Sequence, residues 1–294
     1  MNIKDTLNIR LIQLLRLIPI YSPFERGLWR VENVINKLGS ALEDDHTLRI
    51  GSRDKRLFDV RLRDRTYYMG LLGRAVYEPI ETTIAAGKVK AGSVAIDIGA
   101  NFGWYTTLFS RLVGPQGLVH AFEPVPTMFD TLQTNCRLNG CSNVILNNCA
   151  LGDTTGTTVV HDFVDEPSGH ASLFGRSGRR STASSCNIRT LDEYMGRLDQ
   201  PCHFIKCDVE GAEVSVLAGA TDTIQEYLPT ILIEINASCL SHAGHTPLNV
   251  VTMLMKYGYR IYQISAFNTD LTEIKEPLNS HSLPDYTNVL CMPH

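Results

Sequence analysis

Apolar runs that predict strands alternate with amphipathic segments that predict helices, from residue 77 to the end of the chain. The predicted strands are VAIDIG (94–99), LVHAFEP (118–124), NVILNNCAL (143–151), HFIKCDVE (203–210), TILIEIN (230–236), RIYQIS (260–265) and TNVLCMP (287–293). The predicted helices are 79–86, 105–112, 127–139, 213–227 and 248–257. This alternation is typical of a mostly parallel sheet with helices on both faces. We therefore predict an α/β fold with a seven-stranded, Rossmann-like sheet over residues 76–294.

The first quarter of the chain follows a different pattern. Residues 4–42 have a helical pattern that is interrupted at Pro19 and Pro23. The segments TLRI (47–50) and LFDVRLRD (57–64) flank a polar turn, which predicts a short hairpin. Residues 1–75 are therefore expected to form an accessory segment of helices and a hairpin.

One internal stretch has no apolar periodicity. Residues 165–185 are rich in Ser, Gly and Arg and lie between the apolar segments TTVVHDF (157–163) and CNIRTLDEY (186–194), which predicts a mobile loop. Two interpretations remain open for this loop. Either it closes over an acceptor and attracts an anionic group, or it is a solvated crossover.

The composition narrows the class of protein. The 294 residues are 44% hydrophobic and 20% charged, which excludes a disordered, collagen-like or multi-span membrane protein. The net charge of −4 supplies no broad basic surface, so nucleic acid is not an expected partner. The eight cysteines include no C-x-x-C pair, and a structural zinc site is not predicted. Buried free thiols fit a reducing setting, and we expect a cytoplasmic protein.

The N-terminal residues 1–20 are apolar at helical spacing, but charged residues interrupt them at Asp5, Arg10 and Arg16. They are predicted neither to span a membrane nor to be a cleaved signal. Two interpretations are open: an amphipathic helix that rests on a membrane surface or partner, and a helix that packs on its own domain.

Candidate binding residues follow the predicted strands, because ligands of open α/β sheets bind beyond the carboxyl ends of the strands. The first strand is followed by a turn with Gly99, Asn101 and Gly103, which let the backbone turn tightly and a ligand approach it. This G-x-N-x-G spacing is a weaker signal for pyrophosphate than G-x-G-x-x-G. The second strand ends at Glu123, whose carboxylate suits the hydroxyls of a ribose and would repel the 2′-phosphate of NADP. The residues alone therefore favour an adenosine ligand.

At these positions the chain resembles the FkbM-type family of S-adenosylmethionine-dependent methyltransferases. The matching segments are YEPIE (77–81), DIGANFGWYT (97–106), AFEPVP (121–126), NCALGD (148–153), TLDEY (190–194), FIKCDVEGAEVSVLAGA (204–220) and ILIEIN (231–236). The resemblance implies a class I methyltransferase core, S-adenosylmethionine as cofactor, and O-methylation of a sugar, glycan or secondary metabolite. It also implies that the methionine half of the cofactor contacts Asp97, Gly99, Asn101 and Gly103, with the ribose at Glu123 and adenine near Ala150.

The candidate catalytic residues leave the later strands. Asp208 is the first candidate for a general base or for a group that orients the acceptor hydroxyl, and Glu210 and Lys206 share its face while strand geometry lasts. Glu234 leaves the next strand, and the loop residues His242 and His245 are further candidates. These oxygen ligands could instead hold a divalent cation such as magnesium, although no metal is the expected state.

We therefore expect an O-methyltransferase that acts on a small-molecule or glycan acceptor. Two alternatives remain: a nicotinamide-dependent oxidoreductase, and a non-catalytic scaffold module that binds an adenosine ligand. The sequence leaves the acceptor and the oligomeric state open.

Overall fold

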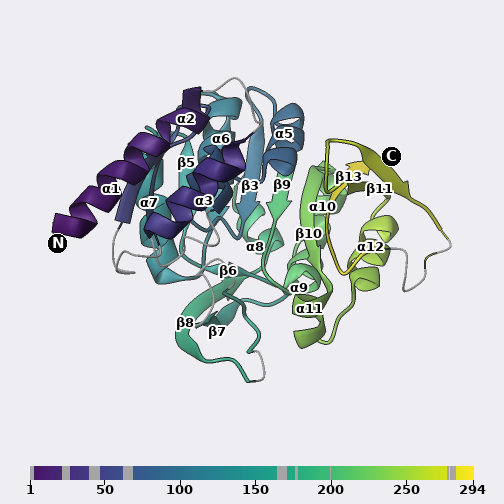
Figure 1. Ribbon diagram of the computed structural model, residues 1–294. Coiled ribbons are helices and arrows are strands. Elements are labelled where there is room, and N and C mark those ends of the chain that lie inside the picture. The colour runs from purple at the N-terminus through teal and green to yellow at the C-terminus, as the bar shows by residue number, and fades with distance from the viewer. Residues whose placement is uncertain are drawn as a thin grey trace.

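The computed structural model describes residues 3–21, 27–39, 47–61, 69–163, 171–175, 178–198, 200–276, 278 and 283–294 (Figure 1). Its largest sheet has eight strands. In spatial order they are β12 (Leu271–Ile274), β11 (Tyr259–Ile264), β13 (Tyr286–Pro293), β10 (Thr230–Asn236), β9 (Phe204–Cys207), β3 (Val94–Ile98), β4 (Leu118–Phe122) and β5 (Val144–Asn147).

The direction of the strands confirms the predicted α/β fold with a mostly parallel, Rossmann-like sheet. Strands β5, β4, β3, β9 and β10 pair in parallel, so their carboxyl ends meet at one edge. Strand β13 runs antiparallel between β10 and β11. The sheet differs from the prediction by one strand, because β12 pairs antiparallel with β11 at the edge. The polar sequence LTEI gave no apolar signal for that strand.

Two hydrophobic cores cover the two faces of this sheet. Successive strand residues point to opposite faces: Ala95 and Phe204 join one core, whereas Ile96 and Ile205 join the other. The first core includes α5 (Pro79–Lys88) and α6 (Trp104–Val113). The second includes α8 (Leu191–Met195), α9 (Glu213–Ala218), α10 (Thr221–Tyr227), α11 (Ala237–His242) and α12 (Pro247–Lys256). Helices therefore lie on both faces, as predicted.

The N-terminal segment contains the predicted helices and hairpin. Its helices are α1 (Ile3–Leu15), α2 (Leu17–Tyr21), α3 (Leu28–Gly39) and α4 (Met69–Arg74), and its strands β1 (Thr47–Gly51) and β2 (Leu57–Arg61) pair antiparallel. The hairpin docks on α7 (Pro126–Leu138), whose Asn135 Oδ1 accepts a hydrogen bond from the Asp59 N–H at 2.7 Å. Phe58 of the hairpin packs against Phe102 and Trp104. The segment thus shares the first core with the sheet, and its division from the rest at residue 75 stays a prediction.

The run NVILNNCAL was expected to be one strand, and the structure divides it. Strand β5 ends at Asn147, and β6 (Ala150–Leu151) joins a separate three-stranded sheet with β8 (Ser181–Arg189) and β7 (Gly156–Phe163). Because β8 begins at Ser181, the last part of the predicted loop 165–185 is strand. Residues 164–170 and 176–177 lie outside the described residues.

The expected helix 213–227 is two helices, α9 and α10, because the chain turns at Gly219. A Cβ at Gly219 would lie 1.9 Å from the carbonyl oxygen of Gly152, so this close approach admits only glycine. Local periodicity could not reveal the break, since Gly152 belongs to a distant segment.

No helix in the described ranges is long and apolar enough to cross a membrane. Helix α1 packs on its own domain through Ile12, which is fully buried, while Leu7, Leu11 and Leu14 are exposed. This packing agrees with the interpretation of a helix that packs on its own domain, and contact of residues 1–20 with a membrane surface stays an open alternative.

Arg16 anchors the N-terminal helices to the hairpin and to α4. It is buried, and its guanidinium donates to the carbonyl oxygens of Leu71, Leu72 and Gly51 at 2.6–2.7 Å. Burial lowers the pKa of Arg16 to about 10, which leaves the group charged at neutral pH.

We expect Arg16→Ala to lower the free energy of unfolding by about 2–4 kcal/mol, because three buried carbonyl groups lose their donors. Urea denaturation measures this change. Arg10→Ala, at an exposed position on α1, is the control and should change the free energy of unfolding by less than about 0.5 kcal/mol. Equal effects of the two substitutions would contradict the anchoring role.

Candidate active site

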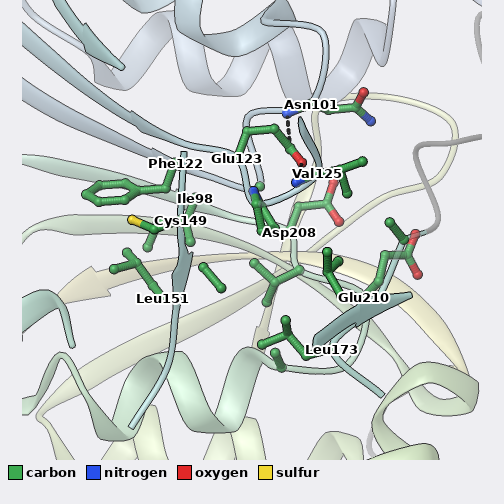
Figure 2. Close-up of a pocket in the computed structure, with 17 residues that line it drawn as sticks. Ile98, Asn101, Phe122, Glu123, Val125, Cys149, Leu151, Leu173, Asp208 and Glu210 are labelled. Carbon is green, nitrogen blue, oxygen red and sulfur yellow. Dashed lines mark hydrogen bonds between the residues drawn. The ribbon is translucent and has the colours of Figure 1, made fainter. Parts of the chain in front are cut away.

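A pocket opens at the carboxyl ends of the parallel strands (Figure 2). Residues from the ends of β3, β4 and β9 form its floor, and residues around β6 and from the β7–β8 hairpin form its walls. The lining residues are Ile98, Gly99, Asn101, Phe122, Glu123, Pro124, Val125, Cys149, Ala150, Leu151, Val160, Ala171, Leu173, Asp208, Val209, Glu210 and Ala212. Gly99, Asn101, Glu123, Ala150, Asp208 and Glu210 were all predicted site residues.

The turn after β3 passes directly over the end of β9. Gly99 has a φ of +80°, and a Cβ at this position would lie 1.8 Å from the carbonyl oxygen of Asp208. The Asp208 N–H donates to the Ile98 carbonyl at 3.0 Å, which continues the β3–β9 pairing into the turn. Only glycine therefore lets the two strand ends come this close.

Glu123 fixes the shape of this turn from β4. One carboxylate oxygen accepts the Asn101 N–H at 2.8 Å, and the other accepts the Val125 N–H at 2.9 Å. Burial raises the pKa of Glu123 to about 7, against the lowering effect of these hydrogen bonds. Each oxygen has a second lone pair, so Glu123 can still accept hydrogen bonds from a ligand.

An apolar slot continues the pocket away from Glu123. Phe122, Cys149 and Leu151 form one side of it (Figure 2), and Ala150 also lines the pocket. Val160, Ala171 and Leu173 of the β7–β8 hairpin also line the pocket. The hairpin is held there by Ser172, whose hydroxyl donates to the Glu210 carbonyl at 2.7 Å.

Asp97 and Gly103 lie behind the pocket and do not line it. Asp97 is buried and accepts a hydrogen bond from the Thr106 hydroxyl at 2.5 Å. A Cβ at Gly103 would lie 2.7 Å from a methyl carbon of Leu132 on α7, so this glycine makes room for helix packing. The structure thus gives both residues a role in the turn, and the cofactor contacts expected for them stay predictions.

Three carboxylates from separate segments meet beside the pocket. Oxygen atoms of Glu78, Asp208 and Glu234 lie within 4.8 Å of one another. Lys206, which is 2% exposed, joins this group through a 3.0 Å ion pair between its Nζ and Asp208 Oδ2. We call these four residues the acidic group. Asp208 belongs both to the acidic group and to the pocket lining.

Tyrosine hydroxyls orient the two outer carboxylates. Tyr105 donates to Glu78 at 2.7 Å, and Tyr286 donates to Glu234 at 2.9 Å. Burial raises the pKa of Glu78 to about 7, although Lys206 opposes the shift, and burial also holds the pKa of Glu234 well above its ordinary value. The neighbouring carboxylates raise the pKa of Lys206, which therefore stays charged. The group can both accept hydrogen bonds and take up a proton near neutral pH.

The other catalytic candidates lie in different surroundings. Glu210 has a φ of +50° and lines the pocket, and its carboxylate accepts a hydrogen bond from the Cys239 thiol at 2.9 Å. The structure does not bring His245 to this pocket: it lines a separate hollow with Leu248 and Met253 on α12. His242 is exposed and bonds the Ser238 carbonyl of its own helix.

Sequence reasoning assigned no role to Glu78, Tyr105 or Tyr286 in this group. Glu78 belongs to the YEPIE segment, but local pattern does not reveal that this segment reaches the end of β9. Glu78 adopts a left-handed φ of +43°, a backbone conformation that is strained for this residue type and often occurs at functional sites.

The sequence matches the family of the methyltransferase FkbM domain over residues 97–261, which is more than half of the chain. The chain belongs to the FkbM methyltransferase family. The resemblance found in the sequence motifs is thereby confirmed.

Several named methyltransferases are similar to this chain. Hexuronic acid methyltransferase AglP of Haloferax volcanii is 33% identical over 179 residues, which cover 59% of this chain and 66% of that protein. Methyltransferase 1 of Beauveria bassiana is 26% identical, over 49% of this chain and 64% of that protein. The 31-O-demethyl-FK506 methyltransferase FkbM of Streptomyces tacrolimicus is 25% identical, over 51% of this chain and 67% of that protein. The chain thus spans about two thirds of the length of these relatives.

A solved FkbM structure is also similar to this one. The methyltransferase FkbM of Methylobacillus flagellatus superposes with a TM-score of 0.47 at 18% identity, over 78% of this chain and 54% of that chain.

We expect Gly99→Ala to destabilise this FkbM-family protein by about 3 kcal/mol or more, because the new methyl group must displace the Asp208 carbonyl. Gly92→Ala is the matched control, since Gly92 has a φ of +77° with open space around its Cβ position. It should cost only the backbone strain of about 1–2 kcal/mol. Urea denaturation of both variants distinguishes the cost of backbone strain from the cost of the steric clash. Equal losses of unfolding free energy would show that the close approach of Gly99 to the Asp208 carbonyl does not affect stability.

Proposed function

We propose that this protein is an S-adenosylmethionine-dependent O-methyltransferase that methylates a hydroxyl of a sugar, glycan or secondary metabolite. One observation carries the proposal: Asp208 lines the pocket and also belongs to the acidic group. A donor in the pocket and an acceptor at the acidic group would therefore meet at Asp208. Methyl transfer requires such proximity, because most of its rate comes from holding the two reactants in line.

The chemistry of the pocket fits this cofactor. Its lining carries the carboxylates of Glu123, Asp208 and Glu210, and the described residues that line it include no Lys or Arg. Such a site suits a cationic sulfonium and disfavours the pyrophosphate of a nicotinamide dinucleotide. The observation favours the methyltransferase over the oxidoreductase.

Specific residues would hold the parts of the cofactor. Glu123 would accept the ribose hydroxyls, the slot around Ala150 would take adenine, and Gly99 and Asn101 would border the methionine half. When bound, S-adenosylmethionine supplies a methyl group that is already activated by its positive sulfur.

The acidic group would bind the acceptor. The carboxylates of Glu78, Asp208 and Glu234 accept hydrogen bonds, so they suit a neutral acceptor that presents hydroxyl groups. Lys206 holds the carboxylate of Asp208 in place through their ion pair. The pKa of Glu78, raised to about 7 by burial, suits a group that takes the hydroxyl proton near neutral pH.

The names of the relatives support this class of acceptor. One is named for hexuronic acid and another for a demethylated hydroxyl of FK506. Both names denote compounds that carry hydroxyl groups, which the acidic group would recognise, while a hexuronic acid also carries a carboxyl group.

A divalent cation is the alternative for the acidic group, because three carboxylates are suitable ligands. The ammonium of Lys206 already lies 3.0 Å from Asp208, so a second cation there would meet direct repulsion. We therefore propose catalysis without a metal. Activity that is lost in a chelator and restored by magnesium would contradict this.

Cofactor binding tests the function directly. We expect S-adenosylmethionine and S-adenosylhomocysteine to raise the melting temperature, by the equivalent of about 2.7 kcal/mol at a concentration of 100 Kd, and NAD and NADP to have no effect. Glu123→Gln should weaken binding of both stabilising ligands by about tenfold, because the amide keeps only one acceptor oxygen. Stabilisation by NAD alone would refute the proposal.

Turnover separates the enzyme from a scaffold. Asp208→Asn should keep cofactor affinity and lower turnover by roughly 10²- to 10⁴-fold.

For the wild type, turnover should rise with pH through about 7, the pKa of Glu78, and then level off, because only the ionised carboxylate accepts a proton.

Glu78→Gln should lower turnover and abolish that rise with pH. Glu226→Gln, at an exposed position on α10, is the matched control and should keep both turnover and profile. If Glu78→Gln and Glu226→Gln both retain the wild-type pH profile, Glu78 is not the proton acceptor. If Asp208→Asn turns over within about threefold of wild type, Asp208 has no role in the reaction.

A further inference from the structure

Helix α7 ends in a turn that brings two cysteines together. The N–H of Cys141 donates to the carbonyl oxygen of Cys136 at 3.0 Å, the N–H of Gly140 donates to that of Arg137 at 3.1 Å, and Gly140 has a φ of +63°. This is the Schellman pattern, in which the side chains of the first and last residues of the turn contact each other. Cys141 packs against the small apolar cluster that contains Cys136.

Cys141 is also accessible from outside. The other cysteines of the chain are all buried, whereas Cys141 is half-buried. It lines an open hollow of about 280 Å³ between the ends of α6 and α7, on the side of the sheet opposite to the carboxyl ends of the parallel strands. Arg56, Thr107, Ser110 and Arg111 line the same hollow.

The hollow contains an unused hydrogen-bond donor. The guanidinium of Arg56 is 1% exposed and stacks on Trp104, 4.0 Å from the ring centre. Its Nε donates to Asp54 at 2.7 Å and its Nη1 donates to the Thr107 hydroxyl at 2.9 Å. No partner for its Nη2 occurs in the described part of the chain. This nitrogen has almost no accessible surface, so Arg56 contributes positive charge to the wall of the hollow.

The surrounding charges favour a thiolate at Cys141. A hydrogen bond from Cys136 lowers the pKa of Cys141 to about 7, assisted by Ser110, Arg56 and Arg111, while burial opposes the shift. The pKa of Cys136 is raised, because its thiol donates to Cys141. Asp54 is the acidic residue nearest to the two arginines, and it pairs with Arg56. The two thiols thus differ in character: Cys141 is the nucleophile and Cys136 keeps its proton.

We infer that Cys141 is a modification site for small hydroperoxides and that Cys136 converts the product into an intrachain disulfide. The Cys141 thiolate attacks one peroxide oxygen and the O–O bond breaks, which gives a sulfenic acid and, from hydrogen peroxide, hydroxide. The positive charges of Arg56 and Arg111, which line the hollow, stabilise the departing anion. The Cys136 thiol then attacks the Cys141 sulfur, the S–O bond breaks, and water leaves. Two thiols and one hydrogen peroxide give one disulfide and two waters. This site is independent of the proposed methyl transfer.

Graded oxidation of the full chain tests the inference. The protein is treated with hydrogen peroxide, the remaining thiols are alkylated, and all cysteines are quantified together by peptide mass spectrometry, so that the buried ones serve as internal controls. We expect Cys141 to be consumed about tenfold faster than the average of the six cysteines other than Cys136, and to appear linked to Cys136. Cleavage at Arg137, between the two cysteines, makes the link visible as joined peptides. Alkylation of Cys141 in the absence of peroxide should reach half its maximal rate near pH 7.

Variants assign the roles of the residues. Cys136→Ser should stop the reaction at the sulfenic acid, which a cyclic 1,3-diketone captures, and Cys141→Ser should abolish the rapid phase. Arg111→Gln should slow oxidation severalfold, whereas Arg260→Gln, an exposed arginine on β11, should not. Consumption of Cys141 no faster than the buried cysteines overturns the inference, and so does rapid consumption without a link to Cys136. Equal rates in the two arginine variants would remove the cationic hollow from the explanation.

Discussion

The active-site region depends on the attraction between the buried ammonium group of Lys206 and the carboxylates around it. A buried lysine is stable only with charged partners close by, and here Asp208 forms the ion pair while Glu78 and Glu234 add attraction. Glu78 precedes α5, Asp208 follows β9 and Glu234 lies on β10, so one cation brings three separate segments together. Without it, carboxylates within 4.8 Å of one another would repel or remain protonated.

This arrangement connects the N-terminal segment to the sheet as well. Tyr105 bonds Glu78 from the first turn of α6, and its neighbour Trp104 lies beneath the guanidinium of Arg56. Arg56 also donates to the Trp104 carbonyl. Arg56 belongs to the turn of the β1–β2 hairpin, so the accessory segment supports the same helix turn that orients Glu78. Substitutions in the hairpin should therefore change the position of the first turn of α6 as well as the stability of the protein.

Much of the fold was predictable from local pattern. Buried parallel strands such as VAIDI and TILIEI are continuous apolar runs. In the helices between them, apolar residues recur at helical spacing and so form one apolar face. Predictions failed where a contact distant in sequence intervenes. The run NVILNNCAL is apolar enough for one strand, but Ala150 pairs with Ile188 of β8 and leaves the central sheet. The helix 213–227 breaks at Gly219 because the Gly152 carbonyl occupies the space beside it.

The sequence by itself determined which residues leave the parallel strands, and hence that Gly99, Asn101, Glu123 and Asp208 share one edge of a sheet. This follows because strand direction and order restrict where a chain end can lie. Only the tertiary structure decided that Asp97 and Gly103 lie behind the pocket, that His245 lies in another hollow, and that Glu78 joins Asp208 and Glu234. These outcomes depend on how loops approach one another in space, and no local periodicity encodes such distances.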